Sequence, residues 1–154
     1  MNDGFRGHLR TIVNNARSIA ASRGSTTIEA EHLLLAILEH PSARLNDGLQ
    51  FLRLTADSVA DALDREFDHA LRAVGVVPPS PLGVLAARRP AKPGWGQSAK
   101  LAWERTARAA SERGAKRLDD RHLLVGITRA EAGVIPRMLD GLGLTPAAIE
   151  RAVI

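Results

Sequence analysis

The chain has 154 residues, of which 45% are apolar and 25% are charged, and it contains no cysteine. This composition is typical of one globular domain and excludes a disulfide framework or a thiolate metal site. The net charge is +4, and residues 75–96 contribute +3 of it through Arg88, Arg89 and Lys92 without any acidic residue. No stretch resembles a signal peptide or is apolar enough to span a bilayer, so we expect a cytoplasmic protein.

The first predicted helix runs from about residue 5 to residue 22. Its apolar residues recur at intervals of three and four and form one stripe. Gly24 follows at the position where a glycine commonly ends a helix in the left-handed conformation. The polar face is basic, because it carries four arginines and no acidic residue. The stripe consists of Leu9, Ile12, Val13, Ala16, Ile19 and Ala20, and the arginines are Arg6, Arg10, Arg17 and Arg23.

Three more helices are predicted in the first half of the chain. The second, about residues 29–40, is so rich in leucine that most of its faces must be covered, which predicts a buried helix. Thr26 and Glu29 have the spacing of a capping box at its start. A third helix is predicted at about residues 43–52, and Thr55 is a plausible N-cap for a fourth.

Residues 75–94 form a predicted basic linker that is rich in proline and glycine. Between residues 75 and 96, five prolines and four glycines exclude a long helix. We interpret this segment as a spacer, with a basic binding strap as the alternative.

After the linker, the pattern of the first half returns at an offset of 90 residues. Gly24 corresponds to Gly114, and His32 corresponds to His122. The aromatic residue at the start of the first helix also recurs, because Trp95 follows Phe5 by 90 positions. The helices predicted in this half cover about residues 97–112, 120–130, 133–140 and 145–153.

A repeat with constant register predicts two copies of one structural unit. We therefore predict an all-α fold with about eight helices in one domain, residues 1–154. The domain consists of two tandem, pseudo-symmetric four-helix repeats, at residues 5–74 and 95–154.

The repeated unit carries a motif at the start of its second helix. Residues 24–38 read Gly-Ser-Thr-Thr-Ile-Glu-Ala-Glu-His-Leu-Leu-Leu-Ala-Ile-Leu, and the second copy keeps His122, Leu123, Leu124 and Ile127. The run resembles the G-x-x-x-I-x-x-E-H-L-L-L-x-L-L signature of the Clp amino-terminal (Clp repeat) domain, which precedes the ATPase modules of Hsp100 unfoldases of the ClpC and ClpA type. The resemblance covers residues 5–63 and 95–153 and implies two copies of a four-helix motif that receives substrates and adaptors.

The resemblance also implies candidate binding residues. In Gram-positive relatives the Glu of each motif holds the guanidinium of arginine-phosphorylated proteins, and Glu31 matches this residue. A carboxylate suits this task because it accepts two parallel N–H bonds from a guanidinium. Arg6 and Arg10 are candidates to meet the phosphate, and Phe5 completes the candidate set. Arg121 occupies the equivalent position in the second repeat and reverses the charge, so we expect one pocket only. The alternative for Glu31 is a solvated acid that interacts with the helix dipole.

The sequence lacks the motifs of several enzyme classes. It contains no G-x-x-x-x-G-K-[ST] phosphate loop, and no serine lies in a G-x-S-x-G or S-x-x-K motif, so no ATPase or other enzyme is predicted. Glu29 and His32, like Asp119 and His122, have the spacing of di-iron helices. Such a site also needs carboxylates from two further helices, and the first helix offers none. We therefore predict no metal and no cofactor, and we expect both histidines to be satisfied by the backbone or a hydroxyl at a helix start.

These features lead to two functional hypotheses. The first is a free-standing Clp repeat domain that binds substrate or adaptor polypeptides, including arginine-phosphorylated proteins or Clp-targeting cyclic peptides, and so modulates or competes with client recognition by a Clp unfoldase-protease. Its partners would be proteins or peptides, among them a Clp ATPase or its clients. The alternative is a basic helical regulatory protein that associates with nucleic acid through Arg88, Arg89, Lys92 and the arginines of the first helix. Steep salt dependence of binding would distinguish the alternative.

Overall fold

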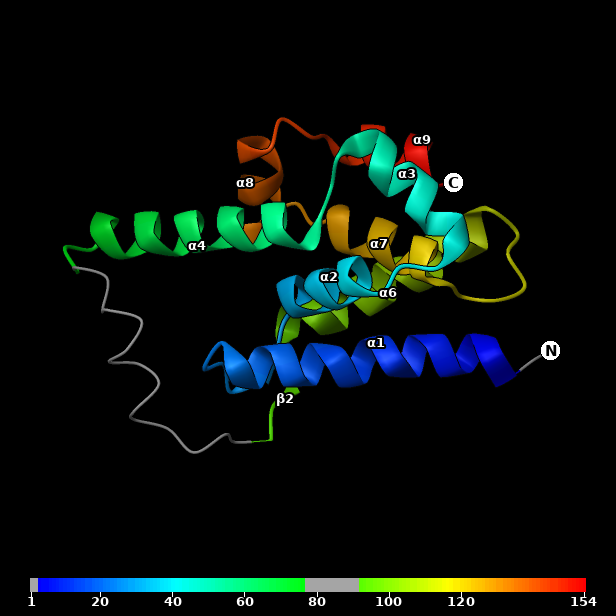
Figure 1. The fold of residues 1–154 in the computed structure, drawn as a ribbon, viewed down its shortest axis with the longest axis horizontal. Coiled ribbons are helices and arrows are strands. Elements are labelled where there is room, and N and C mark those ends of the chain that lie inside the picture. The colour runs from blue at the N-terminus through cyan, green and yellow to red at the C-terminus, as the bar shows by residue number, and fades with distance from the viewer. Residues whose placement is uncertain (1–2, 77–91) are drawn as a thin grey trace.

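The computed structural model describes residues 3–76 and 92–154. Within these ranges the chain forms eight helices and one pair of two-residue strands, and the predicted all-α class is confirmed (Figure 1). The first half contains α1 (Asp3–Ser22), β1 (Thr27–Ile28), α2 (Ala30–Glu39), α3 (Ala43–Leu52) and α4 (Ala56–Ala73). The second half contains β2 (Gly94–Trp95), α6 (Gln97–Glu112), α7 (Asp120–Thr128), α8 (Val134–Gly141) and α9 (Pro146–Val153).

The two halves follow the same plan at the offset of 90 residues that the sequence predicts. The helices α1 and α6 end alike, because Gly24 and Gly114 both adopt the left-handed conformation, with φ of 72° and 61°. In each case the next amide reaches back to close the last helical turn, from Ser25 to the Ala20 carbonyl and from Ala115 to the Ala110 carbonyl, both at 2.9 Å. The same local sequence therefore produces the same helix ending twice.

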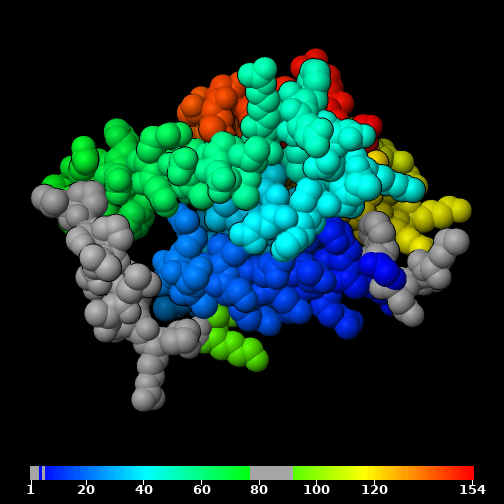
Figure 2. All heavy atoms as spheres, viewed as in Figure 1, coloured from blue at the N-terminus to red at the C-terminus, as the bar shows by residue number. Residues whose placement is uncertain are grey.

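The two leucine-rich helices form the centre of the molecule. Figure 1 shows α2 and α7 running in opposite directions in a middle layer, where they contact each other. On one side, α1 packs on α2 and α6 packs on α7, and on the other side α3 contacts α9 and α4 contacts α8. The space-filling view shows α1 and α4 at the surface (Figure 2). The α3–α9 and α4–α8 contacts join the two repeats, so the repeats share one core.

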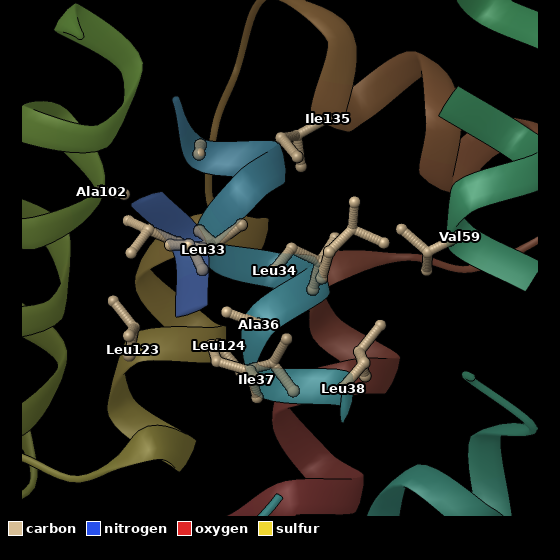
Figure 3. Packing of buried hydrophobic residues seen from close by; sticks show 14 of the residues in the cluster. Leu33, Leu34, Ala36, Ile37, Leu38, Val59, Ala102, Leu123, Leu124 and Ile135 are labelled. Carbon is tan, nitrogen blue, oxygen red and sulfur yellow. The ribbon is translucent and has the colours of Figure 1, made fainter. Parts of the chain in front are cut away.

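The core residues of α2 point in all directions, as expected of a helix that is covered on most faces. Leu33, Leu34 and Ile37 are fully buried, and in Figure 3 Ile37 lies beside Leu124 of α7 while Leu34 lies on the side of Val59 of α4. Burial of such side chains stabilises the fold by about 1.5–3 kcal/mol each. The packing of α2 against α7 therefore fixes how the two repeats sit on each other.

A short parallel strand pair was not predicted from the sequence. Thr27 pairs with Gly94 and Ile28 pairs with Trp95, and the Gly96 amide donates to the Ile28 carbonyl at 2.9 Å. The expected capping box of Thr26 and Glu29 is wrong, because the strand occupies this segment and Glu29 is itself the N-cap of α2. The strand pair joins the beginning of the second repeat to the segment that leads into α2.

Most of the predicted linker, including Arg88 and Arg89, falls on residues 77–91 and lies outside the described residues. Lys92 is described and is exposed. In the described part of the chain, no helix combines the length and the apolar character needed to cross a membrane.

Candidate functional site

The start of α2 carries the main candidate residue, Glu31. Every other residue of this helix from Ala30 to Leu38 is buried, and Glu31 alone is half-buried at its surface. Burial raises the pKa of Glu31 and the nearby Glu29 carboxylate adds to this, while a hydrogen bond from the backbone of Glu31 itself and the charge of Arg23 oppose it. Among the described side chains, none donates a hydrogen bond to the Glu31 carboxylate. This carboxylate is thus partly desolvated without a compensating hydrogen bond from another side chain.

The neighbouring Glu29 is fully engaged and connects the two repeats. Its carboxylate accepts hydrogen bonds from the Thr27 hydroxyl at 2.8 Å, from the Ser98 amide at 3.1 Å, and from the Ser98 hydroxyl. The Ser98 hydroxyl also accepts a bond from the Ala30 amide at 2.8 Å. Burial opposes ionisation, but the bonds from Ser98 and Thr27 outweigh it and lower the pKa of Glu29. We call this arrangement of Glu29, Ser98 and Ala30 the clasp.

The glycine beside the clasp leaves room for the Glu29 carboxylate. At Gly96, the N-cap of α6, an added Cβ would overlap the Glu29 carboxylate. The absence of a side chain lets this carboxylate reach the first turn of α6, where a negative charge is favourable.

Two tryptophans lie next to this region. Trp95 pairs with Ile28, three residues before Glu31, and 39% of its side chain is exposed. Its ring meets the ring of Trp103 edge to face, with centroids 6.4 Å apart and planes at 79°. These are the only tryptophans of the chain, so their fluorescence reports on this part of the surface.

The structure does not bring Arg6 and Arg10 to Glu31. The positive charge that acts on Glu31 is that of Arg23, just beyond the opposite end of α1. Thirteen residues separate Arg10 from Arg23, which corresponds to about 20 Å along a helix. Arg6 and Arg10 are exposed near the start of α7, and the side chain of Phe5 lies outside what the structure describes. The sequence could have identified Arg23 as the arginine near Glu31, because the predicted end of the first helix places Arg23 in the turn that leads to α2.

Arg23 also joins α1 to α4. One terminal nitrogen of its guanidinium lies 2.5 Å from a carboxylate oxygen of Asp64 in α4. Both side chains are partly exposed, so this pair contributes little stability, at most about 1 kcal/mol. It holds the guanidinium near the start of α2, where the charge affects Glu31.

In α7, the position equivalent to Glu31 is Arg121, and its positive charge is already paired within the chain. Arg121 donates from Nε and Nη2 to one oxygen of Asp119, at 3.0 and 2.6 Å. The Asp119 carboxylate also accepts from the His122 amide at 3.0 Å. Burial opposes ionisation, but the bonds from Arg121 and His122 lower the pKa of Asp119. The second repeat therefore offers no open carboxylate at this position.

The two motif histidines have the same place in both repeats. Nδ1 of His32 accepts the Glu29 amide at 2.9 Å, and Nδ1 of His122 accepts the Asp119 amide at 3.2 Å. Burial, together with Arg23, lowers the pKa of His32 to about 4, so its ring is neutral at pH 7 and accepts this bond. Among the described residues, no three His, Asp or Glu side chains gather in a way that would hold a metal ion.

Comparison with known proteins agrees with this architecture. The model of the family described as the Clp repeat (R) N-terminal domain matches residues 5–83, just over half of the chain. No curated protein matches the sequence.

Solved structures of Clp-type N-terminal domains share the fold. The N-terminal domain of the caseinolytic protease associated chaperone ClpD from Arabidopsis thaliana superposes with a TM-score of 0.63 at 17% identity, over 95% of this chain and 92% of that one. The N-terminal domain of Hsp104 from Candida albicans gives 0.65 at 16% identity, over 95% and 86%. The N-terminal domain of the ClpV1 ATPase from E. coli gives 0.55 at 21% identity, over 91% and 77%. With its repeated four-helix plan and its Glu-His-Leu-Leu motif, this chain belongs to the Clp repeat N-terminal domain family.

Proposed function

We propose that this chain is a stand-alone recognition module that binds substrate or adaptor polypeptides of a Clp unfoldase-protease and modulates or competes with client recognition. The binding site is the surface at the start of α2, with Glu31 as its anionic centre. The module has no catalytic role in this proposal. Its ligand is a polypeptide that presents a guanidinium, including an arginine-phosphorylated one.

The observation that carries this proposal is the difference between three acidic residues at equivalent helix starts. Glu29 and Asp119 have their carboxylate oxygens occupied by donors of the chain itself. Glu31 is half-buried, and no other described side chain donates to it. A guanidinium supplies two parallel N–H donors together with a positive charge, and this combination would compensate the desolvated carboxylate.

The surroundings of Glu31 fit such a ligand. Arg23 acts electrostatically on Glu31 and is partly exposed, so it replaces Arg6 and Arg10 as the candidate partner of a phosphate. The exposed Trp95 provides an aromatic surface, and aromatic rings attract cations. Only one such pocket is proposed, because Arg121 and Asp119 satisfy each other in the second repeat.

The test is a titration followed by tryptophan fluorescence. Wild-type protein is titrated with three ligands: a peptide with an unmodified arginine, the same peptide with phospho-arginine, and a Clp-targeting cyclic peptide. We expect Glu31→Gln to weaken peptide binding by about tenfold or more, which corresponds to the roughly 1.5–3 kcal/mol of a hydrogen bond to a charged group.

Asp57→Asn is the matched control, because Asp57 is also an acid in the first turn of a helix and is exposed. Equal affinities of wild type and Glu31→Gln for all three ligands would exclude this pocket. A pull-down from the native cytoplasm with wild type and Glu31→Gln then tests the partner class. Recovery of nucleic acid with steep salt dependence, and of no Clp component or client, would favour the alternative function.

A further inference from the structure

The opposite end of the molecule, where α1 and α7 begin, has a different chemical character. Nε2 of His8 in α1 lies 3.2 Å from the Asp120 carboxylate in the first turn of α7. The same carboxylate accepts the Ser42 amide at 2.8 Å and the Ser42 hydroxyl at 2.9 Å. Asp120 is 1% exposed, so this buried network fixes the starts of α1, α3 and α7 relative to one another.

Basic side chains are exposed at this end of the molecule. We define the basic patch as Arg6 and Arg10 of α1, Lys116 and Arg117 of the α6–α7 loop, and Arg121 of α7. The first four are exposed and Arg121 is half-buried. In the space-filling view the start of α1 (dark blue) and the α6–α7 loop (yellow) lie at the same end of the molecule (Figure 2).

The two described acids of the first turn of α7 and its N-cap, Asp120 and Asp119, are turned inward and do not neutralise the basic patch. Asp119 and Asp120 are 6% and 1% exposed and are bonded to Arg121, His122, His8 and Ser42. Within residues 3–76 and 92–154, none of the four exposed cations forms an ion pair with a described carboxylate. Their charges therefore face solvent.

The comparison between the repeats shows that the fold does not require these charges. At the offset of 90 residues, the equivalent positions in the other repeat are Gly96 and Lys100 for the two α1 arginines, and Thr26, Thr27 and Glu31 for Lys116, Arg117 and Arg121. Those five positions sum to zero, from one lysine and one glutamate, whereas the basic patch sums to +5. The two pseudo-equivalent surfaces of one fold thus differ strongly in charge.

We propose that the basic patch binds an acidic segment of a partner polypeptide, rich in aspartate and glutamate. Guanidinium groups match carboxylates in geometry as well as in charge. Surfaces that bind single-stranded nucleic acid combine cations with aromatic side chains. The exposed aromatic residues among those described, Phe51, Phe67 and Trp95, lie on α3, α4 and β2 and outside the patch. Among the described side chains, the patch offers cations without an aromatic ring, which favours an acidic polypeptide over a single-stranded nucleic acid.

The test measures binding of a fluorescein-labelled Glu-rich decapeptide by anisotropy. The patch variant carries Arg6→Ser, Arg10→Ser, Lys116→Ser and Arg117→Ser, which lowers the net charge from +4 to 0. The control variant carries Arg65→Ser, Arg72→Ser, Lys100→Ser and Arg151→Ser. These four residues are exposed on α4, α6 and α9 and give the same change in net charge. Circular dichroism checks that both variants fold.

We expect the patch variant to lose about tenfold or more in affinity, since each exposed pair contributes up to roughly fivefold. The control variant should stay within about twofold of wild type. Equal losses in both variants would show that net charge alone matters and would overturn the proposal, as would no binding by wild type. Tighter binding of a single-stranded oligonucleotide of equal charge, with a steeper salt dependence, would overturn it in favour of nucleic acid.

Two further variants cover misfolding of the fourfold variant and failure of the Glu31 pocket. If the fourfold patch variant does not fold, Arg117→Glu alone must weaken the decapeptide at least about threefold for the proposal to stand. Glu31→Gln should leave decapeptide binding unchanged, because Glu31 belongs to the other end of the molecule. This variant separates failure of the basic patch from failure of the Glu31 pocket.

Discussion

Removal of the Ser98 hydroxyl tests how much the clasp contributes to the stability of the start of α2. In Ser98→Ala, the Glu29 carboxylate loses one charge-assisted donor, and the Ala30 amide loses its acceptor. A hydrogen bond to a charged group contributes about 1.5–3 kcal/mol, and the neutral bond about 0.5–1.5 kcal/mol. Because the clasp is only partly buried, we expect a total loss of about 2–3 kcal/mol at pH 7. This loss corresponds to a decrease in Tm of about 5–10 °C for a domain of this size.

The sign of the pH dependence follows from Glu29. Its pKa is lowered from the ordinary value of 4.5 in the folded protein, so the clasp stabilises the fold above about pH 4.5. This stabilisation disappears as the pH falls through the folded pKa and the carboxylate becomes protonated. The difference in stability between wild type and Ser98→Ala should therefore decrease in acid.

Urea unfolding followed by tryptophan fluorescence measures this difference at pH 7 and again below pH 4. Ser111→Ala is the control, because Ser111 is an exposed residue of the same helix, and it should change stability by less than about 0.5 kcal/mol. A loss below about 0.5 kcal/mol in Ser98→Ala at pH 7, or the same loss at both pH values, would refute this account of the clasp.

Two further changes in stability follow from the structure. Arg53 is the only described non-glycine residue with positive φ, at 54°, and its equivalent in the second repeat is Gly143, at 70°. Arg53→Gly should stabilise the protein by about 0.5–1 kcal/mol and Gly143→Ala should destabilise it by about 1 kcal/mol in urea unfolding, because only glycine adopts this conformation without strain. A destabilised Arg53→Gly protein together with a stabilised Gly143→Ala protein would contradict this explanation. Glu31→Gln should stabilise the protein at pH 7, because the raised pKa of Glu31 means that its ionised form is disfavoured in the folded state. The gain should vanish below about pH 4.5, where the wild-type residue is protonated in both states, and a destabilised Glu31→Gln protein at pH 7 would show that the carboxylate has a partner.

The raised pKa of Glu31 and its proposed role are two aspects of one arrangement. Because the ionised carboxylate is disfavoured in the free protein, pairing it with a cationic ligand would recover this free energy on binding. Substitutions at this position should therefore improve the fold and weaken recognition together, as is common at functional sites.

The sequence by itself determined the helices, their endings and the duplication. The helix of residues 43–52 and the helix of residues 97–112 have the predicted bounds, and Thr55 and Thr145 cap their helices. These features were predictable because a helix start or end depends on side chains within about four residues of one another. The buried leucine pattern of α2 likewise follows from helical periodicity alone.

Only the tertiary structure decided which segments meet. The Glu29–Ser98 bonds join residues 69 positions apart, and the strand pair of Thr27 with Gly94 spans a similar distance in the chain. The tertiary structure also placed Arg6 and Arg10 near α7, although the sequence suggested a grouping with Glu31. The physical reason is that such contacts depend on how α2 packs against α7, which is set by the shape of the shared core and leaves no periodic signal in the sequence.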